Sequence, residues 1–306
     1  MVAILMSTYN GEKYLKEQID SLLCQTYSDF MLYIRDDGST DGTQQIVSSY
    51  SDTRIRFERG ENLGPAGSFF AALKAVPEVE YIFFSDQDDI WYPDKLAKML
   101  EEIQKYDGTP TMVFSDFAMI GSSGELLSES YSRHASLQVI EGMNSANKII
   151  AQPYVFGCAS VINRLLADMV LDPPEGIEMH DCWISLVAAT AGKLIYMPQA
   201  TISHRFHSDN ATGKSGQDSY FSKFKRATKG LKAQIANTEL RLRQVELLLQ
   251  ELDGRLNSES AEMLKAVSES RQKGKSATVK TLKKYGISRQ RWLNTFFFYI
   301  TVMLTK

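Results

Sequence analysis

Short apolar runs alternate with helix-patterned segments through the first half of the chain, and this alternation restricts the fold more than any other feature. The predicted strands are Val2–Met6, Met31–Arg35, Arg54–Phe57, Tyr81–Ser85 and Thr111–Phe114. The helices predicted between them are Glu12–Cys24, Thr43–Tyr50, Pro65–Val76 and Pro93–Lys105. Strands that alternate with helices form right-handed crossover units. The sequence therefore predicts an α/β fold with a mostly parallel central sheet.

The second half of the chain has weaker strand signals and a helical end. Its predicted elements are strands at Val155–Ile162 and Lys193–Met197 and helices at Asn163–Leu171 and Met179–Ala191. Residues 208–220 are rich in Gly, Ser and Asp, which is typical of a loop. Residues 221–285 are predicted to be helical with a break at Gly254. We therefore divide the chain into a first domain, residues 1–215, and a C-terminal helical region, residues 216–306.

Composition is that of a globular protein from a reducing compartment. The chain is 43% hydrophobic and 23% charged, which excludes wholesale disorder, collagen and a coiled coil. Its three cysteines lie far apart, so neither a disulfide framework nor a cysteine zinc site is expected, and the cytoplasm is favoured. The first apolar run stops at Met6 and follows no basic residues, which indicates a buried strand. No apolar run reaches the roughly 18 residues of a transmembrane helix.

Charge is distributed unevenly between the two regions. Residues 221–306 contain 18 Lys+Arg and 7 Asp+Glu, whereas residues 1–220 contain 16 and 30. Residues 271–306 contain nine Lys+Arg, no acidic residue and a dense aromatic segment near the end. This pattern predicts a basic tail on an anionic membrane surface. The alternative is a terminal helix packed on the protein or on a second subunit of a homo-oligomer. No nucleic-acid partner is expected.

Three carboxylates follow the strand predicted at Tyr81–Ser85. Asp86, Asp88 and Asp89 lie within four residues. Carboxylates at a buried strand end repel one another unless a cation compensates their charge. A hard divalent ion fits, because Mg²⁺ is typically held by one or two carboxylates and substrate phosphates. The alternative is an acidic turn that caps the helix beginning at Pro93.

Other polar residues also follow predicted strands. The segment DDGSTDG, residues 36–42, offers carboxylates that can accept hydrogen bonds from a base or ribose. His207 follows a predicted strand and could reach a metal or a diphosphate, although a lone histidine is more often structural. Asp181 stands beside His180 at a predicted helix start, where it is either a general base or an N-cap. Neither a P-loop nor a G-x-G-x-x-G motif occurs, which disfavours ATP and NAD folds.

Together these residues resemble family 2 glycosyltransferases of the GT-A fold. The matching segments are STYNG at 7–11, DDGSTDGT at 36–43, NLG at 62–64 and DQDD at 86–89. The resemblance covers roughly residues 1–215. It implies a GT-A fold, which is Rossmann-like, with a C-terminal helical extension.

The resemblance also implies which residues bind the donor. Its nucleotide-sugar site would consist of Thr8, Tyr9, Asn10, Asp37, Asn62 and Asp86. Tyr9 would lie against a pyrimidine, Asp37 would accept from the ring N–H, and Asp86 would approach the ribose.

The same resemblance implies the catalytic groups. Asp88 and His207 would hold Mg²⁺ or Mn²⁺, which neutralises charge on the diphosphate leaving group. Asp181 matches the aspartate that activates the acceptor, although the residue before it is His180 where the family usually has Glu. Trp183 would lie beside the acceptor. One displacement would then invert the anomeric carbon.

The motifs RDDGS at 35–39 and FSDQDDIW at 84–91 resemble those of bacterial rhamnosyltransferases that build streptococcal-type rhamnose polysaccharides. This implies dTDP-L-rhamnose as donor and a lipid-linked cell-wall or capsular saccharide as acceptor. The protein would be peripheral at the inner face of the cell membrane. A UDP-hexose donor, a nucleotidyltransferase, a glycoside hydrolase and a non-catalytic binding module are the alternatives. A nucleotidyltransferase would need a basic glycine-rich loop, which residues 7–12 do not supply.

Overall fold

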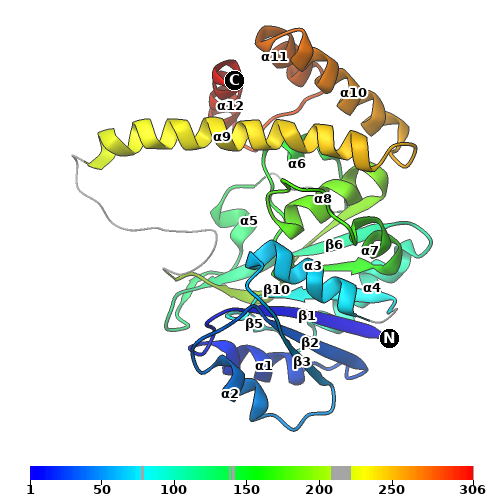
Figure 1. The fold of residues 1–306 in the computed structure, drawn as a ribbon, viewed down its shortest axis with the longest axis vertical. Helices are drawn as coiled ribbons and strands as arrows, with labels where there is room; N and C mark the ends of the chain where they lie inside the picture. The colour runs from blue at the N-terminus through cyan, green and yellow to red at the C-terminus, as the bar shows by residue number, and fades with distance from the viewer. Residues whose placement is uncertain (77–78, 138, 140–141, 208–221, 306) are drawn as a thin grey trace.

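A ten-stranded sheet lies at the centre of the part of the protein that the structure describes, and helices cover both its faces (Figure 1). This computed structural model describes residues 1–76, 79–137, 139, 142–207 and 222–305. The strands are β1 (Val2–Thr8), β2 (Phe30–Asp36), β3 (Ile55–Arg59), β4 (Tyr81–Ser85), β5 (Ile90–Trp91), β6 (Thr111–Ile120), β7 (Leu126–Ser128), β8 (Gly142–Asn144), β9 (Ser160–Asn163) and β10 (Lys193–Arg205). The helices are α1 (Leu15–Leu23), α2 (Thr43–Ser48), α3 (Gly64–Ala75), α4 (Lys95–Ile103), α5 (Tyr131–His134), α6 (Ala146–Ala151), α7 (Arg164–Val170), α8 (His180–Ala191), α9 (Ser222–Glu251), α10 (Ser258–Gln272), α11 (Lys275–Lys284) and α12 (Trp292–Leu304).

The sheet is parallel on one side and mixed on the other. Its strand order is β3-β2-β1-β4-β9-β6-β10-β5. β1 pairs in parallel with β2 and with β4, so that Thr8 lies opposite Asp36 and Met6 lies opposite Ser85. β9 runs antiparallel between β4 and β6, whereas β6 and β10 are parallel. The predicted α/β fold with a central sheet is confirmed, but the sheet is mixed, since β9 pairs antiparallel with β4 and β6, and β5 and β8 pair antiparallel with β10. The carboxyl ends of β1, β2 and β4 meet at one edge.

Two strand predictions need correction. The strand predicted at Val155–Ile162 is wrong in its first part, because Gly157–Ala159 forms a 3₁₀ turn and pairing begins at Ser160. The strand predicted to end at Met197 continues to Arg205 past a register shift between Met197 and Ala200. Pro198 lies in this shift and cannot donate a ladder hydrogen bond, which explains why the sequence suggested an end there.

Side chains of β1 alternate between two hydrophobic clusters. Val2, Ile4 and Met6 pack with α1 and α4 on one face, and Ala3 and Leu5 pack with α3 and α8 on the other. A strand covered on both faces is apolar at every position, as the sequence of β1 is. This burial fixes the strand end from which the polar residues after β1 project.

The C-terminal helices share a core with the second of these faces. The cluster that contains Leu5 also contains Leu242 of α9, Val267 of α10, Leu282 of α11 and Val302 of α12. In Figure 1 the long helix α9 crosses above α6 and α8, and α10 to α12 lie beyond it. The domain boundary predicted at residue 215 lies outside the described residues. Among the described helices, none has both the length and the apolarity needed to cross a membrane.

Candidate active site

A cavity of about 360 Å³ lies beyond the carboxyl ends of β1, β2 and β4. Ligands of open α/β sheets bind at this position. Its wall also includes residues of α3, the start of α8 and the end of β10. The acidic and histidine residues described in its lining are Asp37, Asp86, Asp88, Asp181, His180 and His204. These described lining residues therefore include four aspartates and neither lysine nor arginine.

Asp37 is held rigidly at the floor of the cavity. Its carboxylate accepts hydrogen bonds from the backbone N–H groups of Leu63 and Gly64, each at 2.9 Å, and forms an ion pair with Arg35. Gly64 has a φ of +73°, a backbone conformation that glycine adopts without steric cost. A carboxylate offers about four acceptor positions. One position on Asp37 therefore stays available to a ligand.

The structure brings only some of the predicted donor-site residues to the cavity. Tyr9, 47% exposed, and Asn62 line it together with Asp37 and Asp86. The side chain of Thr8 is instead buried and donates to Oε1 of Gln87 at 2.7 Å.

Asn10 also serves the loop around the site. Its Oδ1 accepts from the backbone N–H of Thr40 at 2.9 Å. Neither Thr8 nor Asn10 is among the residues that line the cavity. Both residues tie the segment after β1 to neighbouring loops.

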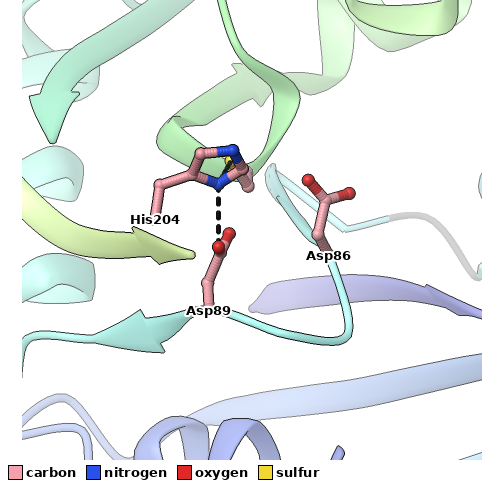
Figure 2. Close-up of side chains that lie close together, drawn as sticks. Asp86, Asp89 and His204 are labelled. Carbon is pink, nitrogen blue, oxygen red and sulfur yellow. Dashed lines mark hydrogen bonds and ion pairs between the residues drawn. The ribbon is translucent and has the colours of Figure 1, made fainter. Parts of the chain in front are cut away.

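The three carboxylates after β4 have different environments, and Figure 2 shows two of them, Asp86 and Asp89, together with His204. Asp86 lines the cavity, and burial together with the charges of Asp89 and Asp88 raises its pKa to about 7. Burial and the charge of Asp89 also raise the pKa of Asp88. Asp89 is fully buried. Although burial alone would raise its pKa, the neighbouring His204 lowers it. Asp89 is therefore the carboxylate most firmly held in its charged form.

Two histidines at the end of β10 face these carboxylates. Nδ1 of His204 lies 2.8 Å from Oδ1 of Asp89, and Nε2 of His207 lies 2.7 Å from Oδ2 of Asp88. Burial alone would lower the pKa of His204, but the charges of Asp89, Asp86 and Asp88 raise it to about 9. His204 therefore carries a positive charge at neutral pH and compensates part of the acidic cluster.

The donor set of this cluster fits a divalent cation. Asp86, Asp89, Cys158 and His204 each offer a ligand atom, and these atoms all lie within 4.8 Å of one another. Oδ2 of Asp89 is buried without a hydrogen-bond partner. Burying a charged carboxylate oxygen costs free energy unless a hydrogen-bond donor or a cation lies against it. Carboxylate oxygens are ligands that suit Mg²⁺ and Mn²⁺.

Asp181 lines the cavity from the first turn of α8. Its Oδ2 accepts from the N–H of Gly157 at 3.1 Å and its Oδ1 accepts from its neighbour Cys182 at 2.7 Å. The two hydrogen bonds fix the orientation of the carboxylate, and the side chain still lines the cavity. The predicted general base is thus brought to the same cavity as Asp86 and Asp88.

His180 lines the cavity beside Asp181, but its polar atoms have no partner. The side chain is buried, its ring stacks on Phe69 with centroids 4.0 Å apart, and neither Nδ1 nor Nε2 makes a hydrogen bond. Burial lowers the pKa of His180, so the ring is neutral at pH 7. A Cβ at Gly157 would come within 2.6 Å of Nε2. Glycine at that position therefore leaves the space beside this nitrogen open.

Trp183 does not occupy the position expected of it. Its side chain is 2% exposed and belongs to the hydrophobic cluster around α8. Trp183 follows Asp181 by two residues and therefore lies on the opposite side of α8, which faces the core. It is not among the residues that line the cavity. The structure therefore does not bring Trp183 to the cavity with the other predicted residues, and its acceptor-side role stays a prediction.

Sequence reasoning gave no role to Gln87 or His204, and it counted Asp89 among the acidic cluster without a partner, yet all three organise the site. Gln87 joins two loops, because its Oε1 accepts from Thr8 and from the N–H of Tyr9 at 2.8 Å. Asp89 and His204 form the buried pair described above. The signal for His204 was its position three residues before His207, which became informative only once β10 was known to continue to Arg205.

The family model described as "Glycosyl transferase family 2" matches residues 3–165, which is more than half of the chain. This chain belongs to glycosyl transferase family 2. The match includes the segments after β1, β2 and β4 that form the cavity floor. It ends before Asp181, His204 and His207, so the family model does not cover these residues.

Named relatives are similar over part of their length. An uncharacterized glycosyltransferase of Rickettsia felis is 26% identical over 70% of this chain and 35% of its own length. The chain thus spans about a third of that relative. WfgD of Escherichia coli, named a UDP-Glc:α-D-GlcNAc-diphosphoundecaprenol β-1,3-glucosyltransferase, is 38% identical over 34% of this chain and 42% of its own. RfbG of Shigella flexneri, named a dTDP-rhamnosyl transferase, is 39% identical over 31% of this chain and 36% of its own.

Solved structures support the fold. TarS 1–349 of Staphylococcus aureus, solved with UDP-GlcNAc, has a TM-score of 0.60 and 17% identity over 93% of this chain and 80% of its own. The mannosyltransferase PcManGT of Pyrobaculum calidifontis, solved with GDP-Man and Mn²⁺, has a TM-score of 0.58 and 19% identity over 93% of this chain and 73% of its own. The expected GT-A-like α/β fold with C-terminal helices is confirmed.

Proposed function

We propose that this chain is an inverting, metal-dependent glycosyltransferase that moves a sugar from a nucleoside diphosphate to an acceptor hydroxyl. The charge of the cavity carries the proposal: its described lining has four aspartates and neither lysine nor arginine. Such a lining repels a diphosphate, and the His204 imidazolium offsets only part of the charge. A divalent cation removes this repulsion. Membership of glycosyl transferase family 2 supports the same reaction class.

On the donor side, Asp88 and His207 would hold Mg²⁺ or Mn²⁺, with Asp86 next to the ribose. When bound, the ion would neutralise charge on the diphosphate leaving group. His204 positions Asp89 by pairing with its Oδ1, which would leave the unpartnered Oδ2 of Asp89 to join the ligands of the ion. Tyr9 presents an exposed ring on which a base can stack. The remaining acceptor position of Asp37 suits the N–H of uracil or thymine, with Asn62 beside it.

On the acceptor side, Asp181 would take the proton from the attacking hydroxyl. Its orientation is fixed by two backbone N–H groups, and it lines the same cavity as Asp86 and Asp88. The neutral ring of His180 would exchange a hydrogen bond with a substrate hydroxyl, which satisfies its unpartnered nitrogens. One displacement then inverts the anomeric carbon, and no covalent sugar–enzyme intermediate is required.

For the donor sugar we propose L-rhamnose from dTDP-L-rhamnose. The name of RfbG and the motifs after β2 and β4 support this choice. The apolar side chains Phe69, Phe156 and Met179 in the cavity wall suit the methyl group of a deoxysugar. The name of WfgD supports the second candidate, a UDP-hexose.

For the acceptor we propose a lipid-linked cell-wall or capsular saccharide at the inner face of the cell membrane. Support comes from the diphosphoundecaprenol acceptor in the name of WfgD. Residues 1–215 would carry the transferase site, and residues 216–306 would associate with the membrane or with a second copy of the chain. The shared core of α9 with α8 indicates that the helical region also supports the cavity wall.

A screen of donor hydrolysis tests the proposal. Purified protein is incubated with dTDP-, UDP- and GDP-sugars, with Mg²⁺, Mn²⁺ or EDTA. We expect metal-dependent release of dTDP or UDP and little release of GDP. Hydrolysis that EDTA leaves unchanged, or pyrophosphate release from a nucleoside triphosphate and a sugar phosphate, would overturn it. The second outcome would identify a nucleotidyltransferase.

A further inference from the structure

Helix α12 exposes an apolar face that no described residue covers. The face consists of Trp292, Leu293, Phe296, Phe297, Ile300 and Met303, which recur at helical spacing. Trp292 is 76% exposed, Phe296 56% and Phe297 52%. Large contiguous apolar patches are rare on soluble monomers and mark interaction sites. We call these six residues the α12 face.

The opposite side of the helix is fixed to the protein. Phe298 and Val302 are buried in the shared core, and Oγ1 of Thr301 lies 2.8 Å from Oγ1 of Thr238 on α9. The hydroxyl of Tyr299 donates to the carbonyl of Ile287 at 3.0 Å. The α12 face is therefore held outward by packing on its other side.

The segment that contains the α12 face carries one sign of charge. Residues 271–306 contain nine Lys+Arg and no acidic residue. Lys283, Lys284 and Arg291 are exposed on α11 and at the start of α12. On α9, Glu239 and Glu246 share Arg271, which offsets one of their two negative charges.

We propose that the α12 face docks on an anionic lipid surface. Aromatic side chains flanked by lysine and arginine suit the boundary between headgroups and acyl chains. A second copy of this chain would bring its own positive charge against that of the first, whereas anionic lipid attracts it. The chemistry of the face therefore favours lipid over self-association. The proposal deepens the proposed function, on which its biological role rests, by naming the surface that would hold the enzyme near a lipid-linked acceptor.

Flotation of the full chain with vesicles tests this proposal. We expect the protein to float with phosphatidylcholine vesicles that contain phosphatidylglycerol and to dissociate as salt is raised. The variant Trp292→Ala/Phe296→Ala/Phe297→Ala should float at least about tenfold less, because it removes apolar area that lipid would bury. The variant Lys283→Gln/Lys284→Gln should weaken binding by about fivefold per lysine, on anionic vesicles only. Shortening the chain is less informative, because loss of Phe298 and Val302 would open the core.

Matched controls separate docking from other causes. The variant Met143→Ala/Leu165→Ala/Leu231→Ala removes three exposed apolar side chains from β8, α7 and α9 and should float like the unmodified chain. Equal flotation of the α12-face variant and the unmodified chain would overturn the proposal. A full chain that does not float with the phosphatidylglycerol-containing vesicles would overturn it as well.

Two further measurements identify the other outcomes. A full chain that elutes as a dimer, with an α12-face variant that elutes as a monomer, would assign the face to a second copy instead. Donor hydrolysis without vesicles should be the same in the unmodified chain and the α12-face variant. Flotation without any donor hydrolysis would refute the proposed function and leave the docking surface standing.

Discussion

The cavity beside the sheet buries charged side chains, whereas the last helix exposes apolar ones. Asp88, Asp89 and His204 are buried beyond β4 and β10, and Phe296 and Phe297 face outward on α12. Each arrangement costs free energy in the isolated chain, since buried charge and exposed apolar area are both unfavourable. Each is therefore best explained by a group that the chain binds. The opposite chemistry of the two regions points to a cation with a diphosphate in one and to lipid in the other.

The strongest test of this comparison removes one charge from the cavity. Asp88→Asn should reduce sugar transfer by about a thousandfold, because it removes an oxygen that we assign to the cation. The fold should persist, and Mn²⁺ affinity, measured by electron paramagnetic resonance, should fall. Asp94→Asn is the matched control, since Asp94 is partly exposed, lies outside the cavity lining and pairs with Lys98. Normal turnover by Asp88→Asn at saturating donor would break the assignment.

The next test concerns the carboxylate that we assign to the acceptor side. Asp181→Asn can still accept the hydrogen bond from Gly157 but cannot take a proton. Transfer should fall by about a hundredfold to a thousandfold. Nucleotide affinity, measured by calorimetry, should be unchanged, because we assign the nucleotide to Tyr9, Asp37 and Asn62 and not to Asp181. A parallel loss of nucleotide affinity would place Asp181 on the donor side.

A third test contrasts the two sides of α12. Phe298→Ala should lower the free energy of unfolding by about 3 kcal/mol, since it leaves a cavity in the core shared with α9. Phe297→Ala, one residue earlier and exposed, should change it by less than about 0.5 kcal/mol. Urea unfolding measures both values. Equal losses would mean that the outward side of α12 is covered within the protein itself.

The smallest expected effect concerns His180. His180→Phe preserves the stack on Phe69 and removes both ring nitrogens. We expect kcat/KM to fall by about tenfold, because the variant loses one hydrogen bond to the substrate, which contributes about 1.4 kcal/mol. Since burial lowers the pKa of His180 below its usual value, the ring stays neutral and the deficit should be constant above about pH 7. Unchanged kcat/KM would identify His180 as a packing residue.

Local patterns were sufficient for the first half of the fold. β1, β2 and β4 were predicted within a few residues, because strands covered on both faces are continuously apolar and end where polar loop residues begin. The same rule placed Asp37, Asp86 and Asp88 at one sheet edge, and the structure brings all three to one cavity. Their roles as ligands of a donor and a cation stay predictions.

The part of the cavity near α8 and β10 was less predictable. Trp183 was expected at the acceptor only through resemblance, and the packing of α8 turns it into the core. His204 was overlooked because the strand signal stopped at Pro198. A register shift carries β10 on to Arg205, and only that continuation brings His204 to Asp89.

The sequence by itself determined the alternation of strands and helices, the acidic turn after β4 and the basic, aromatic end of the chain. These are local properties, set by hydrophobic periodicity and by which residues follow a strand. Only the tertiary structure decided that Asp181 lines the same cavity as the acidic turn, that His180 keeps two unpartnered nitrogens, and which side of α12 is left uncovered. Those outcomes depend on contacts between residues far apart in the chain, whose geometry is fixed when the two faces of the sheet pack.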